Sequence, residues 1–180
     1  NFEQSTYHHL YALDMFLFHA VLSQPRGQLD TQYREVLTRM GNLLDALLGT
    51  ARMLPHIGDD DGGRFFYPFG PRERFGRATL ATCAQWLGRR DWTYAAEDLY
   101  PLAAWWMGRA AGSGQGTPTS HFFPNTGLAI MARGPHQVIV DAGPFGPWGA
   151  GHSPSDPLSL VVRTGDEEIL IDPGTYTYVG

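Results

Sequence analysis

Two hydrophobic periodicities divide the chain into a helical part and a strand-rich part. Residues 3–22 are apolar on nearly all sides, which is typical of a helix buried by several neighbours. Residues 31–48 have apolar positions at spacings of three and four, which predicts an amphipathic helix between Asp30 and Gly49. Further helices are expected at residues 74–87 and 94–111, with Pro101 as the break in the second. One all-round apolar helix followed by an amphipathic one suggests an inner and an outer helix of a double-layered ring.

The period changes from 3.6 to 2 after residues 113–119, which have the composition of a linker. Strands are predicted at residues 127–132, 137–142, 158–164 and 167–171. Short strands joined by tight turns, with no helices between them, indicate an antiparallel sheet that forms one layer of a sandwich. The fold class is therefore α+β, with helices in residues 1–112 and the sheet in residues 120–180.

Composition and charge exclude several kinds of partner. The net charge is −5, and the 13 basic residues form no run and no basic helix face, which argues against nucleic acid. No apolar stretch is long enough to span a membrane. The single cysteine, Cys83, is expected to be a small buried apolar residue. The sequence starts at Asn1 and reaches a helix at once, so we expect an interior piece of a longer protein, incomplete at both ends.

The first candidate cluster lies in residues 3–9, with the sequence EQSTYHH. Tyrosine and histidine are natural proton-transfer groups, so Tyr7, His8 and His9 are candidates for acid or base catalysis. A simpler interpretation is a capping segment, begun by Ser5 or Thr6, whose histidines form local hydrogen bonds.

The second cluster, residues 55–64 (PHIGDDDGGR), lies in a long loop. The consecutive aspartates could hold a cation. However, the alternating acids and the distal glutamate of a calcium-binding loop are missing. A solvated acidic turn is the simpler interpretation. Arg64 is suited to pair bidentately with a carboxylate or sulfate.

The third cluster, residues 149–156 (GAGHSPSD), places His152 beside glycine, where the backbone is free to approach a ligand. A surface loop with an incidental histidine is the simpler interpretation. The segment IDPGTY at residues 171–176 follows a strand later and contains Asp172.

Together these segments resemble the heparinase II/III-like family of polysaccharide lyases. The matching stretches are FEQSTYHH at residues 2–9, GDDDGGR at 58–64, GHSPSDPLS at 151–159 and IDPGTY at 171–176. The resemblance implies an (α/α) toroid followed by an antiparallel β-sandwich, with an active cleft between them. It also implies β-elimination on glycans that contain uronic acid, without any required cofactor, by a bacterial protein that is periplasmic or secreted.

The resemblance assigns roles to individual residues. His152 matches the first histidine of the family's catalytic loop. The family's catalytic tyrosine falls at His8, with His9 after it, whereas Tyr7 is one position early. Because one helical residue is about 100° of rotation, Tyr7 and His8 cannot point the same way, and either can hold the acid and base role.

Substrate contacts are expected from Glu3, Gln4 and Arg64. Asp172 matches a ligand of the structural zinc found in family relatives. Pro154 replaces another ligand of that zinc and cannot coordinate it, so a bound metal is not expected here.

Two other functions stay open. A non-catalytic glycan-binding relative is favoured by His8 and Pro154, and a glycoside hydrolase on a similar toroid would need a carboxylate pair, for which Glu3 and residues 59–61 are the candidates. The expected partner is an acidic polysaccharide. Few basic residues lie near the motifs, chiefly Arg64, Arg72 and Arg74, which disfavours a heavily sulfated one. The glycan and the oligomeric state are not identified by the sequence, and the isolated chain is expected to be inactive.

Overall fold

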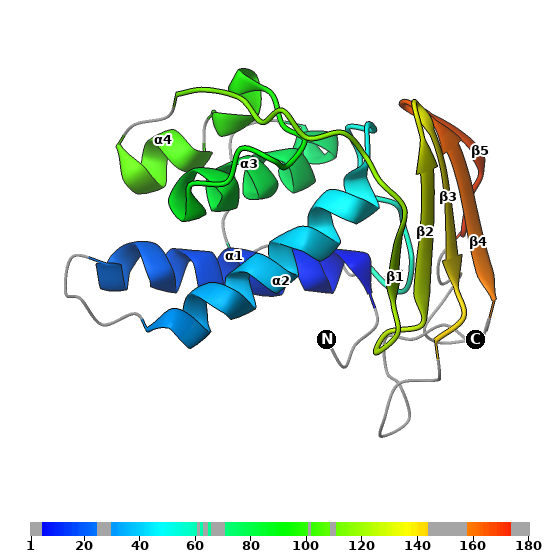
Figure 1. Cartoon of the computed structure of the whole chain (residues 1–180), viewed down its shortest axis with the longest axis horizontal. Helices are drawn as coiled ribbons and strands as arrows, with labels where there is room; N and C mark the ends of the chain where they lie inside the picture. The colour runs from blue at the N-terminus through cyan, green and yellow to red at the C-terminus, as the bar shows by residue number, and fades with distance from the viewer. Residues whose placement is uncertain are drawn as a thin grey trace.

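In the computed structural model the helices lie on one side and an antiparallel sheet stands across their end (Figure 1). The structure describes residues 5–24, 30–60, 62, 65, 71–100, 102–108, 111–143 and 158–173. Its helices are α1 (Thr6–Ser23), α2 (Thr31–Leu48), α3 (Phe75–Leu87) and α4 (Leu102–Met107), with 3₁₀ turns η2 (Arg72–Arg74) and η3 (Ala96–Leu99). Its strands are β1 (His121–Phe123), β2 (Leu128–Arg133), β3 (His136–Asp141), β4 (Ser159–Thr164) and β5 (Glu167–Leu170).

The first two helices form an antiparallel pair whose ends are set by local side chains. Ser5 caps α1 by accepting a hydrogen bond from the backbone N–H of His8 at 3.3 Å. Asp30 caps α2 by accepting from the backbone N–H of Tyr33 at 2.7 Å, and Gly49 ends that helix at a positive φ of 54°. The start of α1 and the end of α2 both lie on the side of the sheet (Figure 1).

The α-helix expected in residues 94–100, ahead of the break at Pro101, is wrong. The Asp98 carboxylate accepts a hydrogen bond from the backbone N–H of Ala95 at 2.8 Å and closes the short turn η3. Tyr100 is extended, with φ −109° and ψ 135°, as residues that precede a proline prefer. Only α4 of this stretch is α-helical among the described residues.

Residues 114–116 are bound to the helical part by backbone hydrogen bonds. The N–H groups of Gly114, Gln115 and Gly116 donate to carbonyls of residues 90–94 at 2.7 to 3.3 Å. A Cβ atom at Gly114 would lie 1.8 Å from the carbonyl oxygen of Trp92, so only glycine fits there. The linker boundaries at 113 and 119 stay predictions.

The sheet is an antiparallel meander in the order β1-β2-β3-β4-β5, which confirms the predicted antiparallel pairing. Ile130, Ile139 and Val161 pair across the three central strands, and this buried row belongs to the same core as the helices. The four predicted strands are present, whereas β1 was not expected because three residues are too short for a period-2 signal. Closure of a toroid and a second sheet stay predictions.

A buried arginine of the sheet joins the two parts of the fold. Arg163 on β4 is 2% exposed and donates to the carbonyls of Leu47, Leu48 and Met53. Its Nε donates to the side-chain oxygen of Gln137 at 2.6 Å, and the Gln137 amide donates to the carbonyl of Ala46 at 2.6 Å. The last carbonyls of a helix have no partners within the helix, so β3 and β4 satisfy those of α2.

Arg77 on α3 completes this arrangement from the helical side. Its guanidinium donates to the carbonyls of Gly49, Ala51 and Thr93 at 2.5 to 2.9 Å. Burial lowers the pKa of Arg163 to about 10 and also lowers the pKa of Arg77, yet both stay charged at neutral pH. Two cations beside the negative end of α2 complement the helix dipole. Within the described residues, no helix is long and apolar enough to cross a membrane.

Candidate functional site

The start of α1 is attached to the loop at residues 55–60 by several hydrogen bonds. The backbone N–H of Thr6 donates to the Ile57 carbonyl at 3.0 Å, and its hydroxyl donates to the Pro55 carbonyl at 2.6 Å. The Ser5 hydroxyl donates to the Asp59 carbonyl at 2.5 Å. Residues from the first and second sequence clusters are therefore side by side, and the helix start is fixed in position.

Side chains from this loop and from η2 converge on Tyr7. The guanidinium carbon of Arg72 lies 4.5 Å from the centre of the Tyr7 ring, and the His56 ring meets it edge-on with centroids 6.0 Å apart. Arg72 also forms an ion pair with Asp60. The ring of Tyr7 is thereby in contact with both a cation and an imidazole. We call Tyr7, His56, Asp60 and Arg72 the Tyr7 cluster.

His8 and His9 have different surroundings. His8 is half-buried, whereas His9 is 6% exposed and its Nε2 lies 3.0 Å from the Met40 carbonyl. A carbonyl only accepts, so Nε2 carries the proton. Burial lowers the pKa of His9 to about 4, and the imidazole is neutral at physiological pH. This geometry gives His9 a packing role; its catalytic assignment stays a prediction.

The buried His9 is expected to make the protein less stable in mild acid. Its pKa is about 4 when folded and 6.5 when exposed, so the unfolded chain binds a proton first as pH falls. Its contribution is complete above pH 6.5 and is lost between pH 6.5 and about 4, amounting to about 3 kcal/mol. This loss of stability is measured by urea unfolding of the wild type and of His9→Gln, whose amide can still donate to the Met40 carbonyl. Equal losses of stability in the two proteins would contradict it.

The acidic turn is less solvated than expected. Asp59 is buried, and Asp60 accepts a hydrogen bond from the backbone N–H of Gly62 at 3.0 Å while it pairs with Arg72. A solvated turn is therefore wrong for Asp59. Within the described residues, no group of three or more histidine, cysteine or acidic side chains is placed to hold a metal ion.

Several of the remaining predicted residues lie outside the part of the chain that the structure describes. Glu3, Gln4, Arg64 and His152 lie outside the described residues, as do Asn1, Asp61 and Pro154. Asp172, the predicted metal ligand, is buried, and its carboxylate accepts a hydrogen bond from the Ser159 hydroxyl at 2.5 Å. This carboxylate alone does not make a zinc site, because zinc needs several ligands around one point. The match of Asp172 to a zinc ligand of the family stays a prediction, as does the expectation that no metal is bound here.

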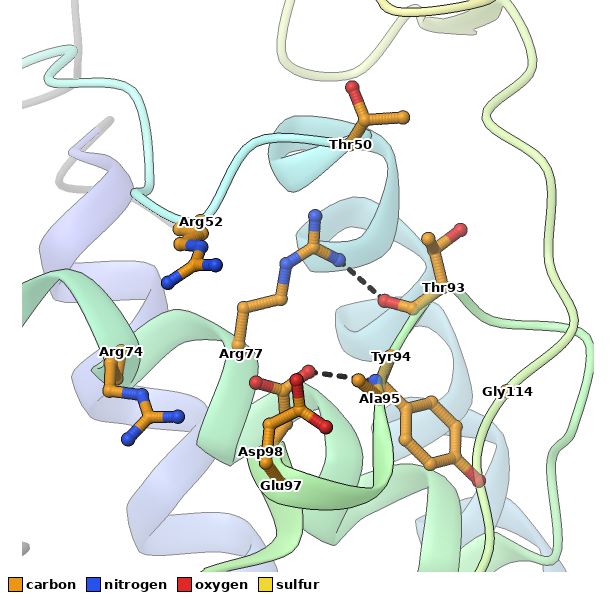
Figure 2. Close-up of a pocket in the computed structure, with 10 residues that line it drawn as sticks. All are labelled: Thr50, Arg52, Arg74, Arg77, Thr93, Tyr94, Ala95, Glu97, Asp98 and Gly114. Atoms are coloured by element: carbon orange, nitrogen blue, oxygen red, sulfur yellow. Dashed lines mark hydrogen bonds between the residues drawn. The ribbon is translucent and has the colours of Figure 1, made fainter. Parts of the chain in front are cut away.

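A cavity of about 320 Å³ lies beside the end of α2 and the start of α3. Figure 2 shows Arg52 and Arg74 on one side of it and Thr93, Tyr94 and Gly114 on the other. Arg77, Glu97 and Asp98 lie between them, and Thr50 and Ala95 complete the lining. The turn η2 connects this cavity to the Tyr7 cluster, because it carries both Arg72 and Arg74.

Two features of this region were missed from the sequence. His56 was recognised only as part of the loop motif at residues 55–64. Arg72 was recognised only as a basic residue near the motifs. The contacts of both with Tyr7 bridge chain segments that are 49 and 65 positions apart, from 7 to 56 and from 7 to 72. The only signal in the sequence was the density of polar residues in an unusually long loop.

Comparison with known proteins relates the strand-rich part of this chain to one protein family. Residues 115–180 match the family model "Heparinase II/III-like, C-terminal". No curated protein matches the chain. The resemblance predicted from the four sequence segments is confirmed by the family match, which lies in the strand-rich part.

Solved structures extend the likeness to the whole chain. The crystal structure of heparan sulfate lyase HepC from Pedobacter heparinus matches with a TM-score of 0.69 and 20% identity. A mutant of the same lyase matches with a TM-score of 0.66 and 19% identity. Each alignment covers 100% of this chain and 26% of the other chain, so this chain spans about a quarter of the length of those lyases.

Proposed function

We propose that this chain, whose residues 115–180 match the family model of the heparinase II/III-like C-terminal domain, is part of a polysaccharide lyase that cleaves uronic-acid-containing glycans by β-elimination. The family match carries the proposal, and the fold shared with the lyase structures over the whole chain supports it. We also propose that the protein acts outside the cytoplasm on an acidic polysaccharide.

The chemistry sets three requirements. The proton on C5 of the uronate is only weakly acidic while the adjacent carboxylate stays charged, so the site must stabilise the negative charge that develops on that carboxylate. A base must remove the proton, and an acid must protonate the O4 leaving group. The base takes one proton, the C4–O4 bond breaks, and a C4–C5 double bond forms without the addition of water.

The Tyr7 cluster supports a proton-transfer role for Tyr7. Its ring is fixed by Arg72 and His56, and preorganised groups transfer protons without the cost of reorientation. His8 is the second candidate for this role. His152 is proposed as the base or as its partner, and Glu3, Gln4 and Arg64 as substrate contacts. No step requires a cofactor.

The burial of Tyr7 favours one alternative. Its side chain is 5% exposed, which is little for a group that must touch substrate. A non-catalytic relative that binds an extracellular glycan is therefore the second candidate function. Replacing His152 would leave glycan binding intact in such a protein.

The test uses the intact protein that carries this chain and a panel of uronate polysaccharides. Ultraviolet absorbance follows a new double bond conjugated to the carboxylate, and we expect it to rise with wild type and to stay flat with His152→Ala. New reducing ends without absorbance would indicate hydrolysis instead. Binding without either signal would identify the glycan-binding relative.

A further inference from the structure

The cavity in Figure 2 combines a free cation with a free carboxylate across an open space. Among the described residues, the Arg74 guanidinium and the Glu97 carboxylate make no hydrogen bond or ion pair. They line the same cavity without approaching within the 4 Å of an ion pair. Opposite charges that face one space without pairing leave both groups available to a ligand.

The other charged groups of the cavity are already engaged in the fold. Arg77 donates to three backbone carbonyls, Asp98 accepts from Ala95, and the Nε of Arg52 lies 3.5 Å from the carboxylate of Asp166 in the turn between β4 and β5. These contacts hold the walls in position, so the cavity does not depend on a ligand for its shape. Arg74 and Glu97 are the members that remain for recognition.

The charge and the volume of the cavity restrict the class of ligand that it can hold. Three arginines and two carboxylates line the cavity; Arg52 is paired with Asp166 outside the lining, and Arg74 is the arginine whose charge has no partner among the described residues. The volume of about 320 Å³ is near the lower end of the range for small-molecule sites, roughly 300–1,000 Å³. One available cation suits one carboxylate better than several sulfates. A neighbouring glutamate suits a ligand that also offers hydroxyl donors.

We propose that this cavity binds one uronate residue of an unsulfated acidic glycan, with Arg74 paired to the sugar carboxylate and Glu97 accepting from ring hydroxyls. The identity of the ligand rests on the proposed function, because a uronate glycan is the substrate class of that reaction. The cavity is a binding subsite apart from the Tyr7 cluster and connected to it through η2.

The experiment is an equilibrium titration of the intact protein with a tetrasaccharide of alternating glucuronate and N-acetylglucosamine. It uses the His152→Ala background, so that cleavage cannot interfere. We expect Arg74→Ala to raise Kd about 10-fold, because it removes a charge-assisted hydrogen bond. Glu97→Gln keeps one acceptor oxygen and should raise Kd by less. Arg39→Ala removes the same charge from an exposed position on α2 and should leave Kd unchanged.

A carboxyl-reduced tetrasaccharide distinguishes recognition of the sugar carboxylate from nonspecific binding. It should bind the wild type more weakly and should not distinguish Arg74→Ala from wild type. If Arg74→Ala and Arg39→Ala have the same Kd for the charged tetrasaccharide, the subsite is refuted. Arg74 is exposed, so its replacement should not unfold the protein.

A second measurement blocks the cavity directly. Thr50 is exposed and lines it, and Cys83 is fully buried with its pKa raised to about 12, so Thr50→Cys is the reactive thiol of this chain. A bulky maleimide at that position should weaken tetrasaccharide binding, and unchanged binding would contradict the proposal. Arg74-dependent binding without elimination in the absorbance assay would keep the subsite and overturn the lyase. Elimination without Arg74-dependent binding would keep the lyase and overturn the subsite.

Discussion

Replacing Arg163 with methionine is expected to lower the free energy of unfolding by about 3–5 kcal/mol. Methionine fills a similar volume, so the loss comes from polar groups rather than from a cavity. The carbonyls of Leu47, Leu48 and Met53 would stay buried without the donors that Arg163 supplies. Each orphaned buried acceptor costs about 1–3 kcal/mol, and partial access of water reduces the sum.

This case differs from a buried ion pair, which hydrophobic residues can replace with little loss. The partners of Arg163 are mainly backbone carbonyls, and no substitution can remove them. Lysine keeps the charge but lacks the planar fork of donors, so Arg163→Lys should recover only part of the stability.

Chemical denaturation of the intact protein measures these changes. The matched control is Arg133→Met on β2, an exposed arginine of the same sheet, which should change stability by less than about 0.5 kcal/mol. If Arg163→Met falls within that range as well, the hydrogen bonds between the sheet and α2 contribute little, and packing alone holds the two parts together.

Tyr7→Phe is expected to lower kcat/KM for elimination by about 10²–10⁴-fold, mainly through kcat. The substitution removes one hydroxyl and leaves the ring that Arg72 and His56 contact, so the cluster keeps its shape. This prediction rests on the proposed lyase activity. The measurement is steady-state kinetics of the absorbance change on the uronate glycan that the panel identifies.

Two variants make this result specific. Tyr11→Phe makes the same chemical change one helical turn later on α1 and should leave the kinetics unaltered. His8→Gln tests the neighbouring candidate and should have a much smaller effect than Tyr7→Phe. The reverse order, with His8→Gln inactive and Tyr7→Phe active, would move the proton-transfer role to His8.

The regular elements were predictable where local signals were strong. Asp30 and Gly49 mark the two ends of α2, and alternation located four of the five described strands. Residues 94–100 misled the prediction because an apolar run indicates burial without specifying an α-helix. There the side chain of Asp98 competes successfully for a backbone N–H.

The site was predictable only in part. Tyr7 was found because chemistry-bearing residues crowd the start of one helix. The contributions of Arg72 and His56 depend on tertiary contacts that no local pattern encodes. The sequence contains a weak indication that Arg163 is buried, because strand alternation places it on the same face as the buried Val161. An arginine on a core face needs acceptors, but the sequence does not say that the end of α2 supplies them.

The cap on α2 also bears on the order of folding. Each hairpin of the central sheet can close locally, since β2 to β3 and β4 to β5 turn within two residues. The hydrogen bonds from Arg163 to Leu47 and Leu48 instead join positions 116 and 115 residues apart. Closing such a long loop costs more chain entropy than closing a hairpin. Helix pair and meander are therefore expected to form early, and the carbonyls of α2 stay hydrated until the two halves dock late in folding.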